Sequence, residues 1–572
     1  MDEQTVVPGE RAGEEQGWHE RLADKAEALQ TTPLAMWLDG GSRLCRARAE
    51  ALSWRWGPLT LDASKQRLDQ EALRLLVDWA ESRELHRWRE ALFAGEIVNP
   101  SEGRPAWHAA SRWGVEPPAP SGSEAAVAEA QSQRRRMSAL VEHIRAGRWQ
   151  GATGRPIRHL VHIGVGGSDL GPRLVSEALA EEGDADAIEV HFVSSMDGGQ
   201  LLPLMERLDP AATLLVVASK SFTTADTSFN LRTALAWLEA SLETGEAEIR
   251  RHQLIGVSAH PERMTAFGIP DAHQLTFSEG VGGRFSLWSA IGVSLAVRIG
   301  MPAFEGLLEG AHAMDRHFLE APSHDNLPVL SAVIGAWNSQ FLGIPTHAIL
   351  PYDSRLASLP AYLQQLEMES NGKSCTRDGR PVESATCPIL WGEVGPDAQH
   401  AFYQLLHQGS HTVSAELLAV AQRHGARGGR LGACLRDQQR LTLANCLAQS
   451  QLLALGDEAI PSSLQGFLSQ GYRGNQPHSV LLMESLTPQA LGSLLALYEH
   501  KVFVQSLLWG LNPFDQPGVE LGKRLASSLY RRLGGEDVEP EETVRDVATE
   551  RLVSRLTGLD GLTSAMAPRS MP

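Results

Sequence analysis

The chain has 572 residues, 42% of them hydrophobic, and a formal net charge of −18 at pH 7. This length is too great for one simple core, so two or three lobes are expected. The negative charge repels the phosphate groups of nucleic acids and anionic lipids, so neither nucleic acid nor a membrane is expected as a partner.

The N-terminal part of the chain is predicted to be mostly helical. Residues 1–17 are rich in Glu and Gly and are expected to form a disordered tail. Between residues 18 and 120, apolar side chains recur at helical spacing, and we expect this helical region to pack on the larger lobe. The acidic N-terminus does not resemble a signal peptide, and no apolar run reaches the roughly 20 residues of a membrane span. A cytoplasmic protein is therefore expected.

Residues 121–285 alternate short apolar runs with amphipathic segments. This pattern is typical of a parallel sheet that is covered by helices on both faces. The expected strands are HLVHIGVG, IEVHFVS, TLLVVAS and HQLIGVS.

Residues 286–515 are predicted to form a second, more helical lobe. Its strand candidates are THAILPY and CPILWGE, and one helix is expected from Pro488 to Trp509. Residues 516–572, with the acidic spacer GGEDVEPEET, are expected to form a helical arm and a tail. The predicted fold class is α/β.

The spacing of cysteine and histidine predicts no metal site. The five cysteines are odd in number and contain no Cys-x-x-Cys pair, so reduced thiols are expected. His407 and His411 stand four apart, as zinc ligands can, but no third ligand follows at a recognisable spacing. The glycine-rich stretch around Gly164 matches neither a dinucleotide fingerprint nor a P-loop. We expect neither a metal nor an organic cofactor.

A strand, a glycine-rich turn and a helix start follow one another in HLVHIGVGGSDLGP, residues 159–172. Glycines in such a turn let backbone N–H groups approach a ligand, and the following helix N-terminus favours anions. A tight strand–helix connection explains the stretch equally well.

Four hydroxyl residues and one lysine crowd residues 219–224 (SKSFTT), directly after the strand TLLVVA. Ligands of open α/β sheets bind outside the carboxyl ends of the strands. Hydroxyls, backbone amides and an ammonium group make a suitable phosphate cradle. The alternative is a Ser/Thr-rich helix cap, and the lysine among the hydroxyls favours phosphate.

Two stretches each contain one charged candidate. In EGVGGRFSLWSAIG, a Gly-Gly pair precedes Arg284, whose guanidinium could stabilise a developing oxyanion. A solvated surface Arg is the usual alternative, but the neighbours here are glycines and apolar residues. In PAYLQQLEMESNGK, Gln365 and Glu369 would share one face of a helix that ends at an Asn-Gly pair. Glu369 could act as a base if partly desolvated, although a solvated helix Glu is favoured when this stretch is taken alone.

Two polar stretches complete the candidates. In QHAFYQLLHQGSH, His400 and His407 are seven apart, roughly on one helical face, although a lone His is more often structural. In NPFDQPGVELGK, Pro517 suits the first turn of a helix, with Gln516 just outside it and Lys523 two turns further on. An ordinary amphipathic helix start is the alternative.

Together these stretches resemble the glucose-6-phosphate isomerase (phosphoglucose isomerase) family. The matching segments occur in the family's order and span residues of about 90 to 523. They are ALFAGEIVN, HIGVGGSDLGP, ASKSFTT, VGGRFSLWSAIG, MESNGK, QHAFYQLLHQG, ALYEHKVFVQ and DQPGVELGK. The resemblance implies two three-layer αβα lobes of the sugar-isomerase (SIS) type. It also implies reversible conversion of glucose 6-phosphate to fructose 6-phosphate, in glycolysis and gluconeogenesis, without a cofactor.

The resemblance further implies a role for each matching residue. Glu369 would move a proton between C2 and C1, and Arg284 would stabilise the intervening cis-enediolate. His400 and Lys523 would open the sugar ring. Those that would hold the phosphate or position the sugar are Gly167, Ser168, Ser219, Lys220, Ser221, Thr224, Gln365 and Gln516.

In this family the dimer is the catalytic unit, so a homodimer is implied in which the neighbouring subunit supplies His400. Some positions differ from the family's pattern. Asp226 stands where the family has a Glu that supports the ring-opening His, and Pro517 replaces a Trp. Two alternatives stay open: a broader isomerase that also accepts mannose 6-phosphate, and a non-catalytic sugar-phosphate sensor.

Overall fold

The computed structural model describes residues 8–114, 118–183, 188–423, 428–464, 471–536 and 546–558. These fall into two compact units, Met1–Phe514 and Asp515–Pro572. In the first unit the main hydrophobic core is continuous from Leu160 in the smaller sheet to Leu481 in the larger one.

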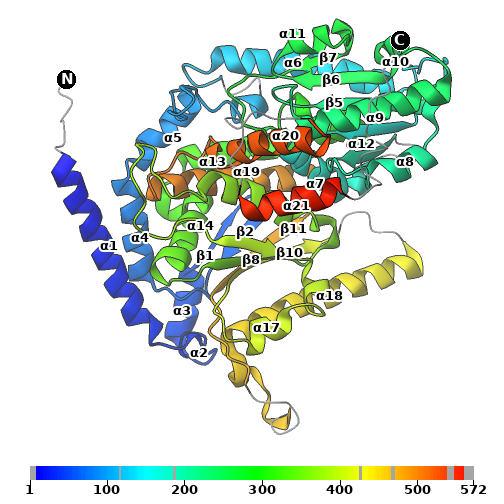
Figure 1. The fold of residues 1–572 in the computed structure, drawn as a ribbon. Helices are drawn as coiled ribbons and strands as arrows, with labels where there is room; N and C mark the ends of the chain where they lie inside the picture. The colour runs from blue at the N-terminus through cyan, green and yellow to red at the C-terminus, as the bar shows by residue number, and fades with distance from the viewer. Residues whose placement is uncertain are drawn as a thin grey trace. The chain divides into compact units, whose positions relative to one another are not determined.

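The smaller sheet has five parallel strands in the order β4-β3-β5-β6-β7. Strands β5, β6 and β7 of this sheet are labelled in Figure 1. The strands are β3 (His159–Ile163), β4 (Glu189–Val193), β5 (Thr213–Ala218), β6 (Leu254–Ser258) and β7 (Gln274–Thr276). The central strands are apolar on both faces, as expected where helices cover a parallel sheet. Four strands coincide with the predicted runs, whereas the short β7 was not predicted. The helices of this region are α6 (Glu124–Arg145), α7 (Leu170–Ala178), α8 (Leu201–Arg207), α9 (Ala225–Leu242), α10 (Glu246–Gln253), α11 (Pro261–Ala266) and α12 (Val293–Ile299).

The larger sheet has six strands in the order β1-β2-β11-β10-β8-β9, and its first two strands are antiparallel to their neighbours. The strands are β1 (Ser53–Trp56), β2 (Leu59–Asp62), β8 (Thr346–Pro351), β9 (Ile389–Gly392), β10 (Ser414–Gln422) and β11 (His478–Ser485). Its helices are α13 (Met301–Glu320), α14 (Leu327–Ala336), α15 (Leu359–Leu363), α16 (Gly395–Ala398), α17 (Tyr403–Gln408), α18 (Gly429–Leu455) and α19 (Pro488–Leu508). Helix α19 is buried along almost its whole length and packs against α13. It ends one residue before the predicted Trp509.

The structure corrects two predictions about the N-terminal region. Helix α1 (Pro8–Gln30) covers residues 8–17, which were expected to be disordered; their Glu, Gln, Arg and Ala are good helix formers, and Pro8 suits a first helical position. The region up to residue 120 is also not purely helical. Residues 53–62 form the β1–β2 hairpin, because Gly57 turns at a positive φ of 49° and Trp54 and Trp56 favour a strand. The remaining helices are α2 (Leu34–Trp37), α3 (Arg43–Ala51), α4 (Gln70–Ser82) and α5 (Leu85–Ala94).

The second unit contains α20 (Glu520–Leu533) and α21 (Val547–Thr557). A 3₁₀ turn at Pro517–Val519 precedes α20, so Pro517 occupies a first-turn position as predicted. An ion pair of 2.7 Å between Arg532 and Glu550 joins the two helices. In the described part of the chain, no helix is both long enough and apolar enough to cross a bilayer. All five cysteines are free thiols.

Candidate active site

The glycine-rich turn after β3 packs directly against two distant segments. A methyl group on Gly167 would lie 1.9 Å from the carbonyl oxygen of Gly283, and one on Gly166 would lie 2.9 Å from the side-chain nitrogen of Gln365. Gly166 also adopts a positive φ of 59°. Glycine is therefore required here by close approach as well as by backbone conformation. The turn therefore contacts both the segment that carries Arg284 and the segment that carries Glu369.

Arg284 is a buried residue with an ordered guanidinium, so the surface alternative is wrong. Its side chain is 2% exposed. Its Nε donates to the Ser370 hydroxyl over 2.6 Å, and its Nη2 donates to the carbonyl of Pro513. Its Nη1 lies 3.4 Å from Oε2 of Glu369. These contacts hold the positively charged guanidinium next to the carboxylate of Glu369.

Glu369 is held at the end of a π-helical turn, Gln364–Glu369, that continues α15. Gln365 donates from Nε2 to Oε2 of Glu369 over 3.1 Å, which confirms that the two side chains share a face. The Glu369 side chain is 23% exposed, so it is neither fully solvated nor sealed from a ligand. The π-helical turn is a feature often found at functional sites.

Helix α19 anchors the segment that carries Glu369. Lys501 forms a buried ion pair of 2.8 Å with Glu367, two residues before Glu369. Asn371 donates from Nδ2 to the carbonyl of Val502 over 3.0 Å. Sequence reasoning missed both contacts, although a lysine inside the apolar run ALYEHKVFVQ was a signal for a buried charge pair.

A second buried charge network lies on the same helix. Arg112 pairs with Asp315 and with Glu499, and His500 lies 2.7 Å from Asp315. Burial raises the pKa of Glu499 to about 7, against the opposing effect of the Arg112 guanidinium. Separating the partners would leave an uncompensated charge in the protein interior, which costs free energy. The network therefore favours the packing that keeps Arg112, Asp315 and Glu499 together.

The hydroxyl-rich loop 219–224 connects the carboxyl end of β5 to α9. The hydroxyls of Ser219 and Thr224 share a hydrogen bond of 3.1 Å, and Ser219 also accepts from the backbone N–H of Phe222 over 3.1 Å. Phe222 has a positive φ of 54°, an unfavourable conformation for an aromatic residue. The side chain of Lys220 donates to the carbonyl of Glu279 over 2.7 Å, and burial lowers the pKa of Lys220. The loop is thus folded tightly around its hydroxyl groups.

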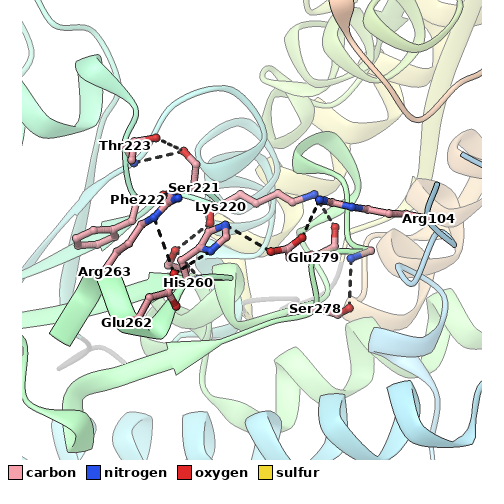
Figure 2. A network of polar contacts seen from close by, with 12 residues as sticks. Arg104, Lys220, Ser221, Phe222, Thr223, His260, Glu262, Arg263, Ser278 and Glu279 are labelled. Carbon is pink, nitrogen blue, oxygen red and sulfur yellow. Dashed lines mark hydrogen bonds and ion pairs between the residues drawn. The ribbon is translucent and has the colours of Figure 1, made fainter. Parts of the chain in front are cut away.

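Figure 2 shows the charged residues around this loop. Arg104 lies 2.8 Å from the carboxylate of Glu279, and His260 lies 3.6 Å from the same group. Arg263 donates to the carbonyl of Ser221 over 2.5 Å. Sequence reasoning missed these residues, because Arg104 is distant in sequence from His260 and Arg263 and none of the three stands in a recognisable motif. They place basic groups close to the loop of an otherwise acidic protein.

The structure places the remaining candidates elsewhere. His400 lies on an exposed turn between α16 and α17, so it does not share a helical face with His407, as the spacing had suggested. His407 bonds to Gln449 over 2.7 Å, and His411 lies beyond the end of α17. Asp226 lies in the first turn of α9.

Gln516 and Lys523 belong to the second unit. Gln516 immediately precedes the turn at Pro517. Lys523 pairs with Glu520 over 2.9 Å and is exposed.

Comparison with known proteins identifies the family of the chain. The family model described as "Phosphoglucose isomerase" matches residues 62–553. The glucose-6-phosphate isomerase 2 of Chromohalobacter salexigens is 50% identical over 498 residues, which cover 85% of this chain and 89% of that protein. The glucose-6-phosphate isomerase of Acinetobacter venetianus is 47% identical over 520 residues, covering 89% and 92%.

A solved structure gives the same result. The crystal structure of a glucose-6-phosphate isomerase from Chlamydia trachomatis superimposes with a TM-score of 0.79 at 32% identity. The match covers 94% of this chain and 98% of that one. On these grounds the chain belongs to the phosphoglucose isomerase family.

Proposed function

We propose that this protein interconverts glucose 6-phosphate and fructose 6-phosphate. One observation carries the proposal: Oε2 of Glu369 lies 3.1 Å from the amide nitrogen of Gln365 and 3.4 Å from the guanidinium of Arg284. A candidate base and a fixed cation therefore lie side by side, and both come from segments that pack against the glycine-rich turn after β3. The relatives named above carry this activity in their names.

The reaction moves a proton between two adjacent carbons of an open-chain sugar. The Glu369 carboxylate takes the proton from C2 of the aldose and returns it to C1, while a second proton passes from O2 to O1, which yields the ketose. Negative charge develops on the oxygens of the intervening cis-enediolate, and the Arg284 guanidinium stabilises it. Gln365 orients the carboxylate. Because Arg284 is already fixed by Ser370 and Pro513, it needs little reorganisation during the reaction.

The phosphate of the substrate is assigned to the loop 219–224 and the turn at Gly167 and Ser168. The loop offers the hydroxyls of Ser219, Ser221 and Thr224 together with Lys220. Its position at the carboxyl end of β5 supports this assignment, since anions bind at that edge of parallel sheets. Contacts to a phosphate remote from the reacting carbons position the sugar for proton transfer.

Ring opening is assigned to His400 and Lys523, with Asp226 supporting the imidazole and Gln516 positioning the sugar. We further propose a homodimer in which His400 reaches the active site of the partner subunit. The exposure of His400 supports this, as does the finding that its side chain forms no hydrogen bond or ion pair within the described ranges.

The alternative of a non-catalytic sugar-phosphate sensor is disfavoured by the structure. A sensor needs only the phosphate loop. Here Gly167 packs against the segment that carries Arg284, and Arg284 lies 3.4 Å from Glu369, which supports the assignment of catalytic groups next to this turn.

The test measures formation of glucose 6-phosphate from fructose 6-phosphate with the Glu369→Gln variant. The amide cannot accept the C2 proton, so turnover should fall by about 10²- to 10⁴-fold. Glu383→Gln, which alters an exposed carboxylate, is the matched control and should retain wild-type turnover. Full activity of Glu369→Gln would refute the mechanism. Comparable turnover of mannose 6-phosphate by the wild type would indicate the broader isomerase.

A further inference from the structure

Two histidines and one glutamate gather at the amino-terminal ends of strands β3 and β4. His159 on β3 is paired in register with Glu189 on β4, and His191 follows Glu189 by two residues. Since side chains two apart on a strand point to the same face, all three lie on one face of the sheet. The smaller sheet ends at β4, so the cluster lies at an edge.

The side chains converge on a common point. Nδ1 of His159 lies 3.4 Å from Oε2 of Glu189, and Nε2 of His191 lies 3.6 Å from the same oxygen. All three atoms lie within 4.8 Å of one another. Both nitrogens are buried, and neither has a hydrogen-bond partner in the described part of the chain. A buried polar atom without a partner costs free energy, so these nitrogens call for a ligand that would satisfy them.

The spacing fits a tetrahedrally bound metal ion. Zinc binds imidazole nitrogen and carboxylate oxygen at about 2.0–2.2 Å, and tetrahedral angles then place neighbouring ligand atoms roughly 3.4 Å apart. The two nitrogen–oxygen separations match that value. Imidazole and carboxylate together suit zinc and its transition-metal neighbours better than magnesium or calcium. We propose that His159, Glu189 and His191 bind one transition-metal dication of the zinc type, with water completing its coordination.

Nearby charges affect how tightly this site would bind a cation. Arg207 and Arg298 act electrostatically on His191 and oppose a cation, whereas Glu189 favours one. Glu189 is also 57% exposed, so water reaches the site. We therefore expect weaker binding than at a closed structural zinc site with four protein ligands.

The site is separate from the proton-transfer chemistry. The glycine turn follows the carboxyl end of β3, whereas His159 begins the strand. Gly164 lies five steps along extended strand from His159, a distance of roughly 16 Å. A metal here would not contact the sugar phosphate. It would instead cross-link the edge strand β4 to β3, so its expected effect is on stability.

The experiment uses the full-length protein after removal of metals with EDTA and dialysis. Titration with Co²⁺, followed by its absorption spectrum, and with Zn²⁺, followed by calorimetry, should show one ion per chain. The variants Glu189→Gln and His191→Ala should each weaken binding by roughly tenfold or more. His252→Ala is the matched control, because His252 faces a single carboxylate, Glu248, at 3.4 Å and should leave binding unchanged.

A second readout separates a built site from incidental surface binding. Zn²⁺ should raise the melting temperature of the wild type and of His252→Ala, but not that of Glu189→Gln. Turnover without metal should be unchanged in every variant, which also verifies that each one folds. If His191→Ala does not fold, the test of metal binding rests on Glu189→Gln. This variant keeps the size of the side chain and is therefore expected to fold. The proposal is overturned if the stripped wild type binds neither ion at millimolar concentration, or if Glu189→Gln binds them as tightly as the wild type.

Discussion

The guanidinium of Arg284 lies 3.4 Å from the carboxylate of Glu369, and both groups are held by other parts of the first unit. Ser370 and Pro513 fix the arginine, and Gln365 fixes the glutamate. In the mechanism proposed above, Glu369 is the base and the adjacent Arg284 stabilises the enediolate. The pair therefore acts as a unit, and changes in either residue should appear mainly in kcat.

Replacement of Arg284 by Lys should lower kcat by about 100-fold with a smaller change in KM. Lysine keeps the charge but loses the planar fork that reaches Ser370, Pro513 and Glu369 together. Steady-state kinetics with fructose 6-phosphate measure the effect. Arg316→Lys is the control, since Arg316 pairs with Glu320 on the surface of α13. A kcat within threefold of the wild type would contradict the role given to Arg284.

Removal of the Ser219 hydroxyl or the Lys220 ammonium should raise KM by roughly tenfold to 100-fold and weaken competition by inorganic phosphate. Hydrogen bonds to a charged group contribute about 1.5–3 kcal/mol each, and the phosphate lies away from the reacting carbons. The variants are Ser219→Ala and Lys220→Met. Thr233→Ala removes an exposed hydroxyl on α9 and should change neither quantity. An unchanged KM in both test variants would place the phosphate elsewhere.

Acidification should destabilise the protein partly through His162, which is buried beneath the glycine turn. His162 contacts the carbonyl of Ser168 over 2.6 Å and the hydroxyl of Ser294 over 2.7 Å. Burial lowers the pKa of His162 from 6.5 to about 4. As the pH falls between these values, the unfolded chain takes up the proton first. The free energy of unfolding should therefore fall, by up to about 3 kcal/mol from this residue.

The measurement for His162 is urea unfolding at pH 7 and at pH 4.5. Other histidines, such as His347 and His478, also have pKa values lowered by desolvation, so the wild type loses stability from several sources. The His162→Gln variant should lose less between the two pH values than the wild type does. The exposed His324→Gln should behave as the wild type. An identical loss in all three proteins would show that His162 does not contribute.

Replacement of Gly167 by Ala should lower the free energy of unfolding by about 1–3 kcal/mol and reduce activity, because the added methyl group meets the carbonyl of Gly283. Gly283→Ala provides a nearby comparison, since a methyl group there meets no atom within 4 Å. Its free energy of unfolding should stay within about 0.5 kcal/mol of the wild type. Equal stability of the two variants would mean that the turn can move away from Gly283.

The sequence predicted those parts of the fold that depend on local pattern. The strand runs HLVHIGVG and TLLVVAS were recognisable, because they are short, apolar and bounded by turns. Strand β10 was not predicted, since SAELLAVAQ is rich in Ala, Glu and Leu and reads as a helix. It is a strand because parallel pairing with β8 and β11 outweighs that preference.

For the active site, local pattern was less informative than resemblance. The stretch around Glu369, read alone, favoured a solvated residue. Its partner Arg284 is distant in sequence, and no periodicity links the two. The helical spacing did predict the Gln365–Glu369 contact, because that contact lies within one helix. The lysine in the apolar run ALYEHKVFVQ indicated a buried charge pair, but its partner Glu367 could not be identified, since that pairing depends on how α19 packs against the π-helical turn.

The pairing of β2 with β11 has a consequence for the order in which the protein folds during synthesis. Residues 59–62 are antiparallel partners of residues 480–483. The larger sheet can be completed only after nearly the whole chain has left the ribosome. Until then the β1–β2 hairpin cannot pair with β11. All strands of the smaller sheet lie within residues 159–276 and can pair much earlier. Because long-range pairing is slow and leaves strand edges open, the hairpin stays exposed to aggregation until β11 has been synthesised.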